Sequence, residues 1–204
     1  GDYAAALANN EHVLAIREAT LGPDHPDVAQ SLVNVAIESK ALGNWAPVMP
    51  NYRRAIAIYD KAYGPGSIDA GVTYLNLAEA QRVRGELDAA GVSYEKSRAI
   101  LAAKLGEDHP ILAHIWNGTG QLELARGHAE AALPLLERAV AMREKDGEAP
   151  DLAESRFALA RALVASHGDR DRARQLATAA RDAYRTSGPG FAKRQADVDA
   201  WLAK

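Results

Sequence analysis

Apolar residues recur every three or four positions along almost the whole chain, which is the spacing of one face of an α-helix. Glycine and proline interrupt this pattern at regular intervals and divide it into ten predicted helices. These are expected at about 1–21, 26–42, 45–63, 67–84, 86–105, 109–126, 128–145, 150–166, 169–186 and 191–202. No stretch alternates apolar and polar residues as a strand would. The pattern therefore predicts an all-α chain.

The interruptions repeat. Residues 21–26 read LGPDHP, and residues 105–110 read LGEDHP, 84 positions later. Weaker copies occur at 63–68 and 146–150. A second marker recurs every 42 positions, with one last step of 41: Gly1, Gly43, Gly85, Gly127 and Gly168. A fixed period of this length indicates stacked helix pairs, so we expect a right-handed α-solenoid of helix-turn-helix repeats with a C-terminal capping helix.

The repeat also sets the boundaries within a single domain, 1–204. Residues 1–22 are the second helix of a truncated repeat, four repeats follow, and 189–204 form the cap; the repeats are 23–64, 65–106, 107–147 and 148–188. The chain begins within a repeat and without Met, so we expect a piece of a longer protein. Asp24 is the expected N-cap of the second helix. Pro50 is expected to delay the start of the third.

Composition excludes several classes of function. The 204 residues are 48% hydrophobic and 25% charged, with a formal net charge of −3. This balance argues against binding to nucleic acid or to an anionic membrane surface. No apolar run approaches the roughly 20 residues that span a bilayer. The chain has no cysteine, which rules out disulfides and favours a cytoplasmic location.

Several positions resemble the tetratricopeptide repeat (TPR). The first helix of successive pairs carries a large residue followed by a small one four positions on, as in Leu32 and Ala36 or Tyr74 and Ala78. A Gly-x-aromatic turn follows, as at 43–45, and then a small residue in the second helix; these small residues are Ala6, Val48, Ala90, Ala132 and Ala173. The usual TPR period is shorter, at about 34 residues. The run from 17 to 29 resembles the longer repeat of kinesin light chains.

The C-terminal part has a narrower resemblance. Residues 157–163, Gly168, Asp169 and the Arg- and Ala-rich helix up to Tyr184 look like the end of the TPR regions attached to bacterial serine/threonine protein kinases. This resemblance implies a regulatory or substrate-recruiting part of a larger signalling protein.

No catalytic, cofactor-binding or metal-binding pattern is found in the sequence. His25 and His109 occupy equivalent positions two periods apart, so stacking would separate them by two layers. A hydrogen bond from loop to helix explains each of them better than a shared metal ion. No Ser, Thr or carboxylate pair lies in a recognisable catalytic motif. We therefore expect a non-enzymatic chain without cofactors.

The candidate binding residues lie on the first helix of each pair. In related repeats these helices line a concave groove, and an Asn there grips the backbone of an extended peptide. An amide side chain can both donate to and accept from a peptide group, and Lys or Arg can bind carboxylates. The candidates are Asn34, Lys40, Asn76, Arg82, Asn117, Gln121 and Arg161. Asn34 and Asn76 are one period apart, as are Lys40 and Arg82. The cations suggest a partially acidic peptide, while Glu79 and Glu154 dilute their charge.

Three functions remain open at this point. The first is a scaffold that binds a protein or an extended peptide. The second is a sensor for a small molecule or a short signalling peptide. The third is self-association through the uncapped N-terminal end.

Overall fold

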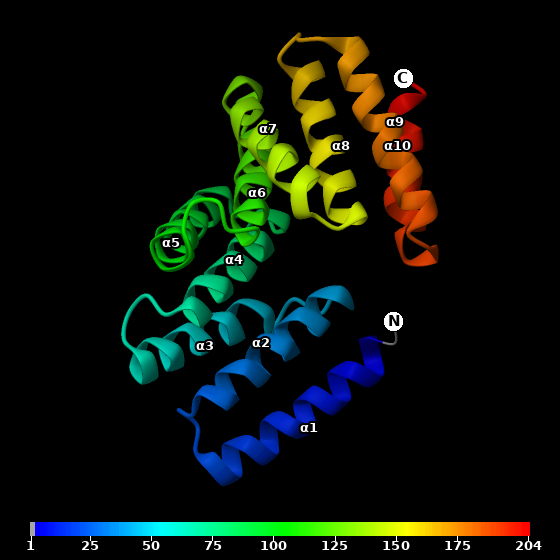
Figure 1. Cartoon of the computed structure of the whole chain (residues 1–204). Coiled ribbons are helices and arrows are strands. Elements are labelled where there is room, and N and C mark those ends of the chain that lie inside the picture. Colours follow the sequence, from blue (N-terminus) through cyan, green and yellow to red (C-terminus); the bar gives the residue numbers. More distant parts are fainter. Residues whose placement is uncertain (1–2) are drawn as a thin grey trace. The chain divides into compact units, whose positions relative to one another are not determined.

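The computed structural model describes residues 3–204, apart from the side chain of Asp146, and these residues contain no strand. Its elements are α1 (Tyr3–Leu21), α2 (Pro26–Ala41), α3 (Val48–Tyr63), α4 (Ile68–Val83), α5 (Leu87–Leu105), α6 (Ile111–Ala125), α7 (Ala129–Asp146), α8 (Ala149–Ala165), α9 (Arg170–Thr186), the 3-10 helix η1 (Pro189–Phe191) and α10 (Ala192–Leu202) (Figure 1). The predicted all-α repeat fold is confirmed. Gly1 and Asp2, the first copy of the glycine turn, lie outside the described residues.

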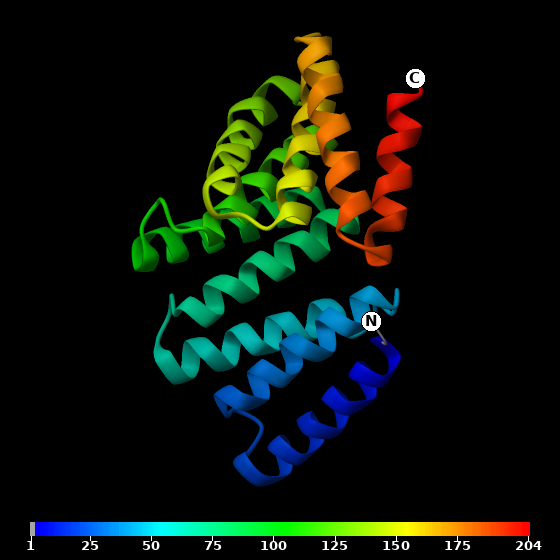
Figure 2. The same ribbon diagram turned by 45° about the vertical axis from the view of Figure 1, so that its right-hand side comes forward.

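The chain forms two compact units, Gly1–Gly106 and Glu107–Lys204, which we call unit 1 and unit 2. Within each unit, every helix packs against its neighbours in sequence, as the turned view also shows (Figure 2). We call the first helix of each repeat helix A, namely α2 and α4 in unit 1 and α6 and α8 in unit 2. The second is helix B. None of the helices in the described part is both long and apolar enough to cross a membrane.

A left-handed residue joins helix A to helix B in each repeat. Gly43, Gly85 and Gly127 have φ angles of 77°, 78° and 82°, a region that glycine adopts without steric cost. In the fourth repeat this conformation belongs to His167, with a φ of 57°, and not to Gly168. The assignment of Gly168 to this turn was therefore wrong by one residue. The segment from Gly127 to His167 spans 40 positions, two fewer than the period.

Small residues allow helices A and B to approach closely. A Cβ atom added to Gly120 of α6 would lie 2.5 Å from Cγ of Leu136 on α7. One added to Gly71 of α4 would lie 2.9 Å from Cδ2 of Leu101 on α5. Both distances are too short for a real contact, so any larger side chain at these positions would push the two helices apart.

The start of α2 differs from the prediction. Its N-cap is His25, whose Nδ1 accepts a hydrogen bond from the backbone N–H of Asp27 at 3.1 Å. Asp24 instead forms an ion pair with Lys61, because its carboxylate points toward helix B of the same repeat. The third helix begins at Val48, three residues later than predicted. Its N-cap is Pro47, and Pro50 lies in its first turn, as expected for a delayed start.

In the first and third repeats, one arginine contact holds the opening loop within its own repeat. Arg54 on α3 donates to the backbone oxygen of Pro23 at 3.1 Å. Arg138 on α7, two periods later, donates to the backbone oxygen of Glu107 at 3.4 Å. Pro23 and Glu107 are equivalent loop positions. The recurrence shows that helix B of these repeats holds the loop that opens the same repeat.

A second arginine contact links one repeat to the next. Arg17 on α1 donates to Asp27 O and to Ser31 Oγ, each at 2.9 Å. Arg143 on α7, three periods later, donates to Asp151 O at 2.7 Å and to Ser155 Oγ at 2.6 Å. In both cases the guanidinium of a helix B binds the first turns of the following helix A.

The predicted C-terminal capping helix is α10. Val198 is fully buried against the core of unit 2, and the ring of Trp201 meets Phe157 of α8 edge-on at 5.8 Å between centroids. Helix α10 therefore covers apolar surface that the last repeat would otherwise expose. At the other end, none of the described residues of α1 is buried, and Tyr3, Val13 and Ile16 are exposed.

Candidate functional site

In unit 1, Asn34 on α2 and Asn76 on α4 occupy equivalent positions of successive A helices, and both are half-buried. Oδ1 of Asn34 accepts a hydrogen bond from Nε2 of Gln30 at 3.1 Å. The amide of Asn76 forms no hydrogen bond with the described residues. One amide is therefore entirely available to a ligand, and the other keeps its N–H donors.

A charged cluster lies one turn further along α4. Both carboxylate oxygens of Glu79 accept from Arg82, at 2.5 and 3.2 Å, and one also accepts from the hydroxyl of Tyr94 at 2.7 Å. Burial by itself would raise the pKa of Glu79. The hydrogen bonds and charge of Arg82, the Tyr94 hydroxyl and the charge of Lys40 outweigh burial and lower that pKa.

This cluster changes the expected role of two cations. Arg82 is committed to Glu79, and its side chain is only 17% exposed, so it is not the available groove cation that the sequence suggested. The positive charge of Lys40, on α2, helps to lower the pKa of Glu79. We call the face made by Asn34, Lys40, Asn76, Glu79 and Arg82 the unit 1 face; these five residues include two cations and one carboxylate.

In unit 2 the amides of the A helix α6 are used internally. Asn117 on α6 is only 4% exposed, accepts from Ser155 Oγ at 3.0 Å and donates to Glu154 Oε1 at 3.3 Å. Gln121 donates to the same carboxylate oxygen at 3.0 Å. The other oxygen of Glu154 lies 3.5 Å from Nη1 of Arg194 on α10. The structure thus contradicts a ligand-facing role for Asn117, because burial and two hydrogen bonds occupy its amide.

The last candidate, Arg161, lies on α8 two turns after Glu154. Its side chain is exposed and forms no ion pair with the described residues. The structure therefore brings Asn117, Gln121 and Glu154 together in unit 2 and leaves Arg161 apart from them.

The sequence analysis missed a second polar cluster in unit 2. A cavity of about 320 Å³ lies between α6, α7 and the start of α8, and His114, Arg143, Glu148 and Asp151 contribute its polar lining. Nδ1 of His114 lies 3.0 Å from Nη2 of Arg143, and Nε2 lies 3.6 Å from Asp151. The recurrence of Arg17 at Arg143, three periods apart, was the one sequence signal that could have found this cluster.

Two causes lower the pKa of His114. Burial is the larger, and the positive charge of Arg143 adds to it, against the opposing charges of Asp151 and Glu154. The imidazole is therefore neutral near pH 7, and its Nδ1 accepts from the guanidinium.

Two other histidines, His25 and His109, have local roles. His25 caps α2, and Nδ1 of His109 accepts from the backbone N–H of Ile111 at 3.3 Å, so the predicted loop-to-helix hydrogen bonds are confirmed. Over the part of the chain that the structure describes, no three His, Asp or Glu side chains come together as a metal site.

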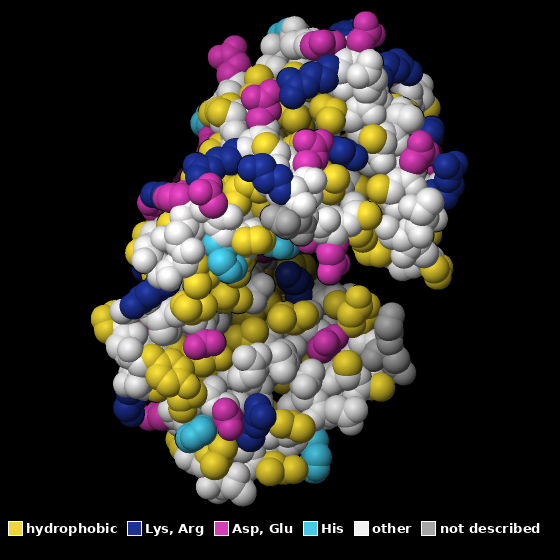
Figure 3. Space-filling view, in the orientation of Figure 1, with side chains coloured by type: hydrophobic (Ala, Val, Ile, Leu, Met, Phe, Trp, Pro, Cys, Tyr) yellow, Lys and Arg dark blue, Asp and Glu magenta, His cyan; other side chains and the backbone are white. Residues whose placement is uncertain are grey.

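Charged side chains are distributed differently over the two units. On the face seen in Figure 3, Lys and Arg alternate with Asp and Glu over α7 to α9 of unit 2. The part of this face that belongs to unit 1 shows fewer charges among apolar and neutral side chains. Neither unit shows the single-sign basic field that is typical of nucleic-acid binding on this side of the molecule.

Comparisons with known proteins identify the family. The tetratricopeptide repeat profile matches residues 1–61 and 69–145. A kinesin light chain of Podosopora anserina with nearly identical TPR-like repeats has a similar structure: TM-score 0.68, 26% sequence identity, and a match spanning 92% of this chain and 89% of that one.

A second solved structure supports the fold alone. BtubC (BKLC) from P. vanneervenii has a TM-score of 0.75 at 20% identity, and the match spans 92% of this chain and 75% of that one. A search of curated protein sequences finds no match. Repeats of this kind are non-enzymatic scaffolds for protein–protein interaction. With the repeat profile matched over most of its length, the chain belongs to the tetratricopeptide repeat family.

Proposed function

We propose that the unit 1 face binds an extended peptide segment of a partner protein, with Asn34 and Asn76 holding its backbone. The observation that carries this proposal is the pair of half-buried amides at equivalent positions, of which Asn76 is entirely without a hydrogen bond in the described chain. A peptide group presents one donor and one acceptor, and an amide side chain matches both. A Lys side chain on this face, Lys40, can form charge-assisted hydrogen bonds with carboxylates, which favours a segment with some acidic residues.

The resemblances support a wider context for this binding. A scaffold of this family would regulate, or recruit substrates to, a larger cytoplasmic signalling protein such as a bacterial serine/threonine kinase.

The proposal is tested by a peptide-display selection on the wild-type protein and on the Asn34→Ala/Asn76→Ala double variant. Asn9→Ala makes the same chemical change on the exposed surface of α1 and is the matched control. We expect peptides with Asp or Glu to enrich on the wild type and on the control, and to be lost on the double variant while circular dichroism shows it folded.

Two outcomes would reject the proposal: no enrichment on the wild type, or the same peptides on the double variant. Enrichment without acidic residues, or no effect of Lys40→Glu, would reject the acidic character alone. Loss of folding in the double variant is checked against Asn76→Ala by itself, which removes no hydrogen bond seen among the described residues.

A second function is favoured by the cavity in unit 2. At about 320 Å³ it reaches the lower end of the ~300–1,000 Å³ range of small-molecule sites, and it combines an apolar side with His114, Arg143 and Asp151. This would make the chain a sensor of a small ligand. A library of metabolites in a thermal-shift assay tests it, since a true ligand raises Tm with its concentration and His114→Ala weakens that rise.

The exposed apolar side chains of α1 support self-association as the third candidate. Light scattering over a concentration series, on the wild type and on Val13→Ser/Ile16→Ser, would decide it.

A further inference from the structure

A second cavity, of about 260 Å³, lies in unit 2 between the end of α8, the first turns of α9 and the last turn of α10. Its lining combines an apolar floor with three cations: Val164, Trp201, Leu202, Arg170, Arg174 and Lys204. Among the described residues, no Asp or Glu side chain lines it. The contact with Phe157 holds the indole of Trp201 in place, so the floor is formed before any partner arrives.

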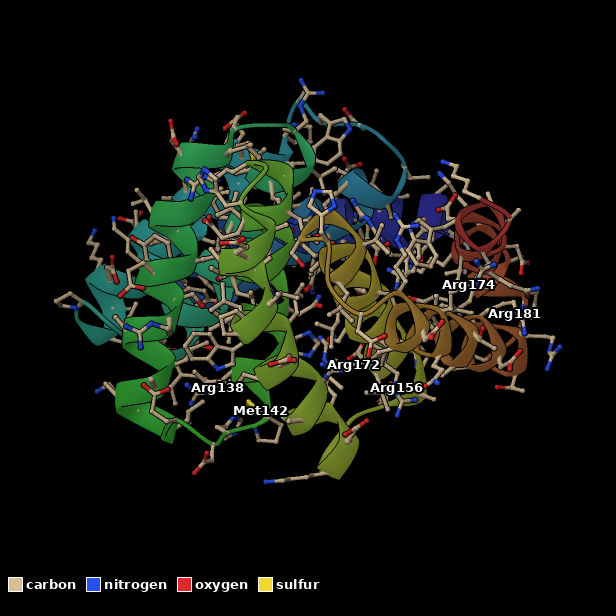
Figure 4. The ribbon with its side chains drawn as sticks, turned by 90° about the horizontal axis from the view of Figure 1, so that it is seen from above. Arg138, Met142, Arg156, Arg172, Arg174 and Arg181 are labelled. Atoms are coloured by element: carbon tan, nitrogen blue, oxygen red, sulfur yellow. The ribbon has the colours of Figure 1, made fainter. Side chains whose placement is uncertain are left out.

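The arginines of this cavity lack the carboxylate partners that other arginines of α9 have. Arg172 forms an ion pair with Glu137 at 2.9 Å. Arg174 donates to the backbone oxygen of Leu202 at 3.0 Å and pairs with no described carboxylate, and the side chain of Arg170 makes no polar contact within the described chain. Figure 4 shows Arg174 on the side of α9 that faces α10, and Arg172 on the side toward α7.

This arrangement favours an incoming negative charge. Arg170 and Arg174 are four residues apart on one helix face, where like charges repel each other. They lie in the first turns of α9, the positive end of its dipole. The nearby acids are Asp169, which caps the helix by accepting from the N–H of Arg172, and Asp171; neither lines the cavity. A carboxylate in the cavity would therefore relieve repulsion and gain charge-assisted hydrogen bonds.

The size of the cavity selects the kind of partner. Its volume of about 260 Å³, close to the ~300 Å³ lower end of small-molecule sites, has room for one carboxylate side chain and an apolar neighbour. We propose that this cavity docks a segment of a partner protein in which an acidic residue adjoins a bulky apolar residue. The proposal is independent of the unit 1 face, since it uses other residues in the other unit.

A random peptide-display library tests this on the full chain, with selection on the wild type and on Arg170→Gln/Arg174→Gln. The matched control is Arg172→Gln, which removes a cation from the same turn of α9 but not from the cavity. We expect a class of peptides that the double variant loses, in which Asp or Glu stands next to Leu, Ile, Met or Phe. A selected peptide should bind the double variant about tenfold or more weakly, and the control almost as well as the wild type.

Two further variants keep the test decisive. Arg170→Gln alone leaves the bond from Arg174 to Leu202 intact, and should weaken binding in a protein whose circular dichroism is unchanged. Asn34→Ala/Asn76→Ala should leave these peptides bound, which separates this site from the unit 1 face. The proposal is overturned if no peptides depend on Arg170 and Arg174, or if the dependent peptides lack the acidic–apolar pair.

Discussion

The A helices of the two units carry similar amide side chains that do opposite things. In unit 1, Asn76 is half-buried and its amide bonds to nothing in the described chain. In unit 2, Asn117 is 4% exposed and both ends of its amide are bonded, to Glu154 and Ser155. The first can serve a ligand, whereas the second holds two neighbouring A helices together.

The difference comes from one carboxylate and its neighbours. Glu154 on α8 accepts hydrogen bonds from Asn117 and Gln121 and forms an ion pair with Arg194. The polar groups of this face therefore satisfy one another. In unit 1 the carboxylate of Glu79 is taken by Arg82 and Tyr94, and the asparagines are left out of the network. We therefore expect an amide on an A helix to be open to a ligand only where no carboxylate of the next A helix binds it.

The largest expected effect concerns the bond network of unit 2. Replacing the buried Arg143 with Ala leaves Asp151 O, Ser155 Oγ and His114 without their donor, and should lower the free energy of unfolding by about 3 kcal/mol. Arg17→Ala removes two equivalent bonds at a more exposed position and should cost about 1 kcal/mol. Urea unfolding followed by circular dichroism measures both. Equal losses of unfolding free energy in the two variants would show that the burial of Arg143 does not strengthen its hydrogen bonds.

A smaller effect separates the two asparagines. Asn117→Ala should lower the free energy of unfolding by about 1–2 kcal/mol, because it leaves a buried part of the network unsatisfied, and should leave peptide binding by unit 1 intact. Asn76→Ala should change stability by less than about 0.5 kcal/mol and weaken binding. The same urea titrations and a peptide-binding assay test the pair. If Asn76→Ala lowered stability and Asn117→Ala weakened peptide binding, the comparison between the two units would be wrong.

The smallest effect is in the pH dependence. The folded pKa of His114 is lowered, so the unfolded state binds its proton more readily; stability should be complete above about pH 6.5 and decrease as the pH falls through the folded pKa. The folded pKa of Glu79 is also lowered, but its contribution is lost only as the pH falls below about 4.5.

Urea midpoints measured from pH 7.5 down to about pH 2.5 cover both ranges. The change below about pH 6.5 should be small, since the His114 side chain is about half exposed. It involves Arg143, Asp151 and Glu154, which face the imidazole. His114→Gln should remove the decrease that begins below about pH 6.5 and keep the one that begins below about pH 4.5, and Glu79→Gln should do the reverse. A curve that neither variant changes would contradict both assignments.

Most of the fold was predictable from the sequence because the repeat makes each signal appear several times. The glycine turns at Gly43, Gly85 and Gly127 came out at the expected residues. The fourth, at His167, did not, because a histidine there gives no sign of its left-handed conformation. The N-cap of α2 was misassigned for a similar reason: Asp24 and His25 can both cap a helix, and only the ion pair with Lys61 decides between them.

The candidate site was less predictable. The period correctly aligned Asn34 with Asn76, but it gave no information about side-chain partners. Asn117 is one position out of register with these two, and that displacement moves it from the surface into the network of Ser155 and Glu154. The cluster around His114 depends on three helices meeting, which no local pattern of residues reveals.

The arginine contact between repeats has a consequence for how such arrays grow by duplication and exchange of segments. The hydrogen bond from Arg54 to Pro23 lies inside one repeat, so a duplicated repeat keeps both partners. The hydrogen bond from Arg17 to Ser31 joins two repeats, so it forms only when one repeat supplies the arginine and the next supplies the serine. At the next junction, Tyr59 and Thr73 occupy the positions of Arg17 and Ser31. The hydroxyl of Thr73 donates within its own helix, to Asp69 O. We therefore expect segments to be interchangeable only between junctions of the same type. A helix that carries Arg17 accepts a successor with a serine at this position, such as Ser155, and a recombinant without that serine would lose the side-chain half of the contact and keep only the bond to the backbone oxygen.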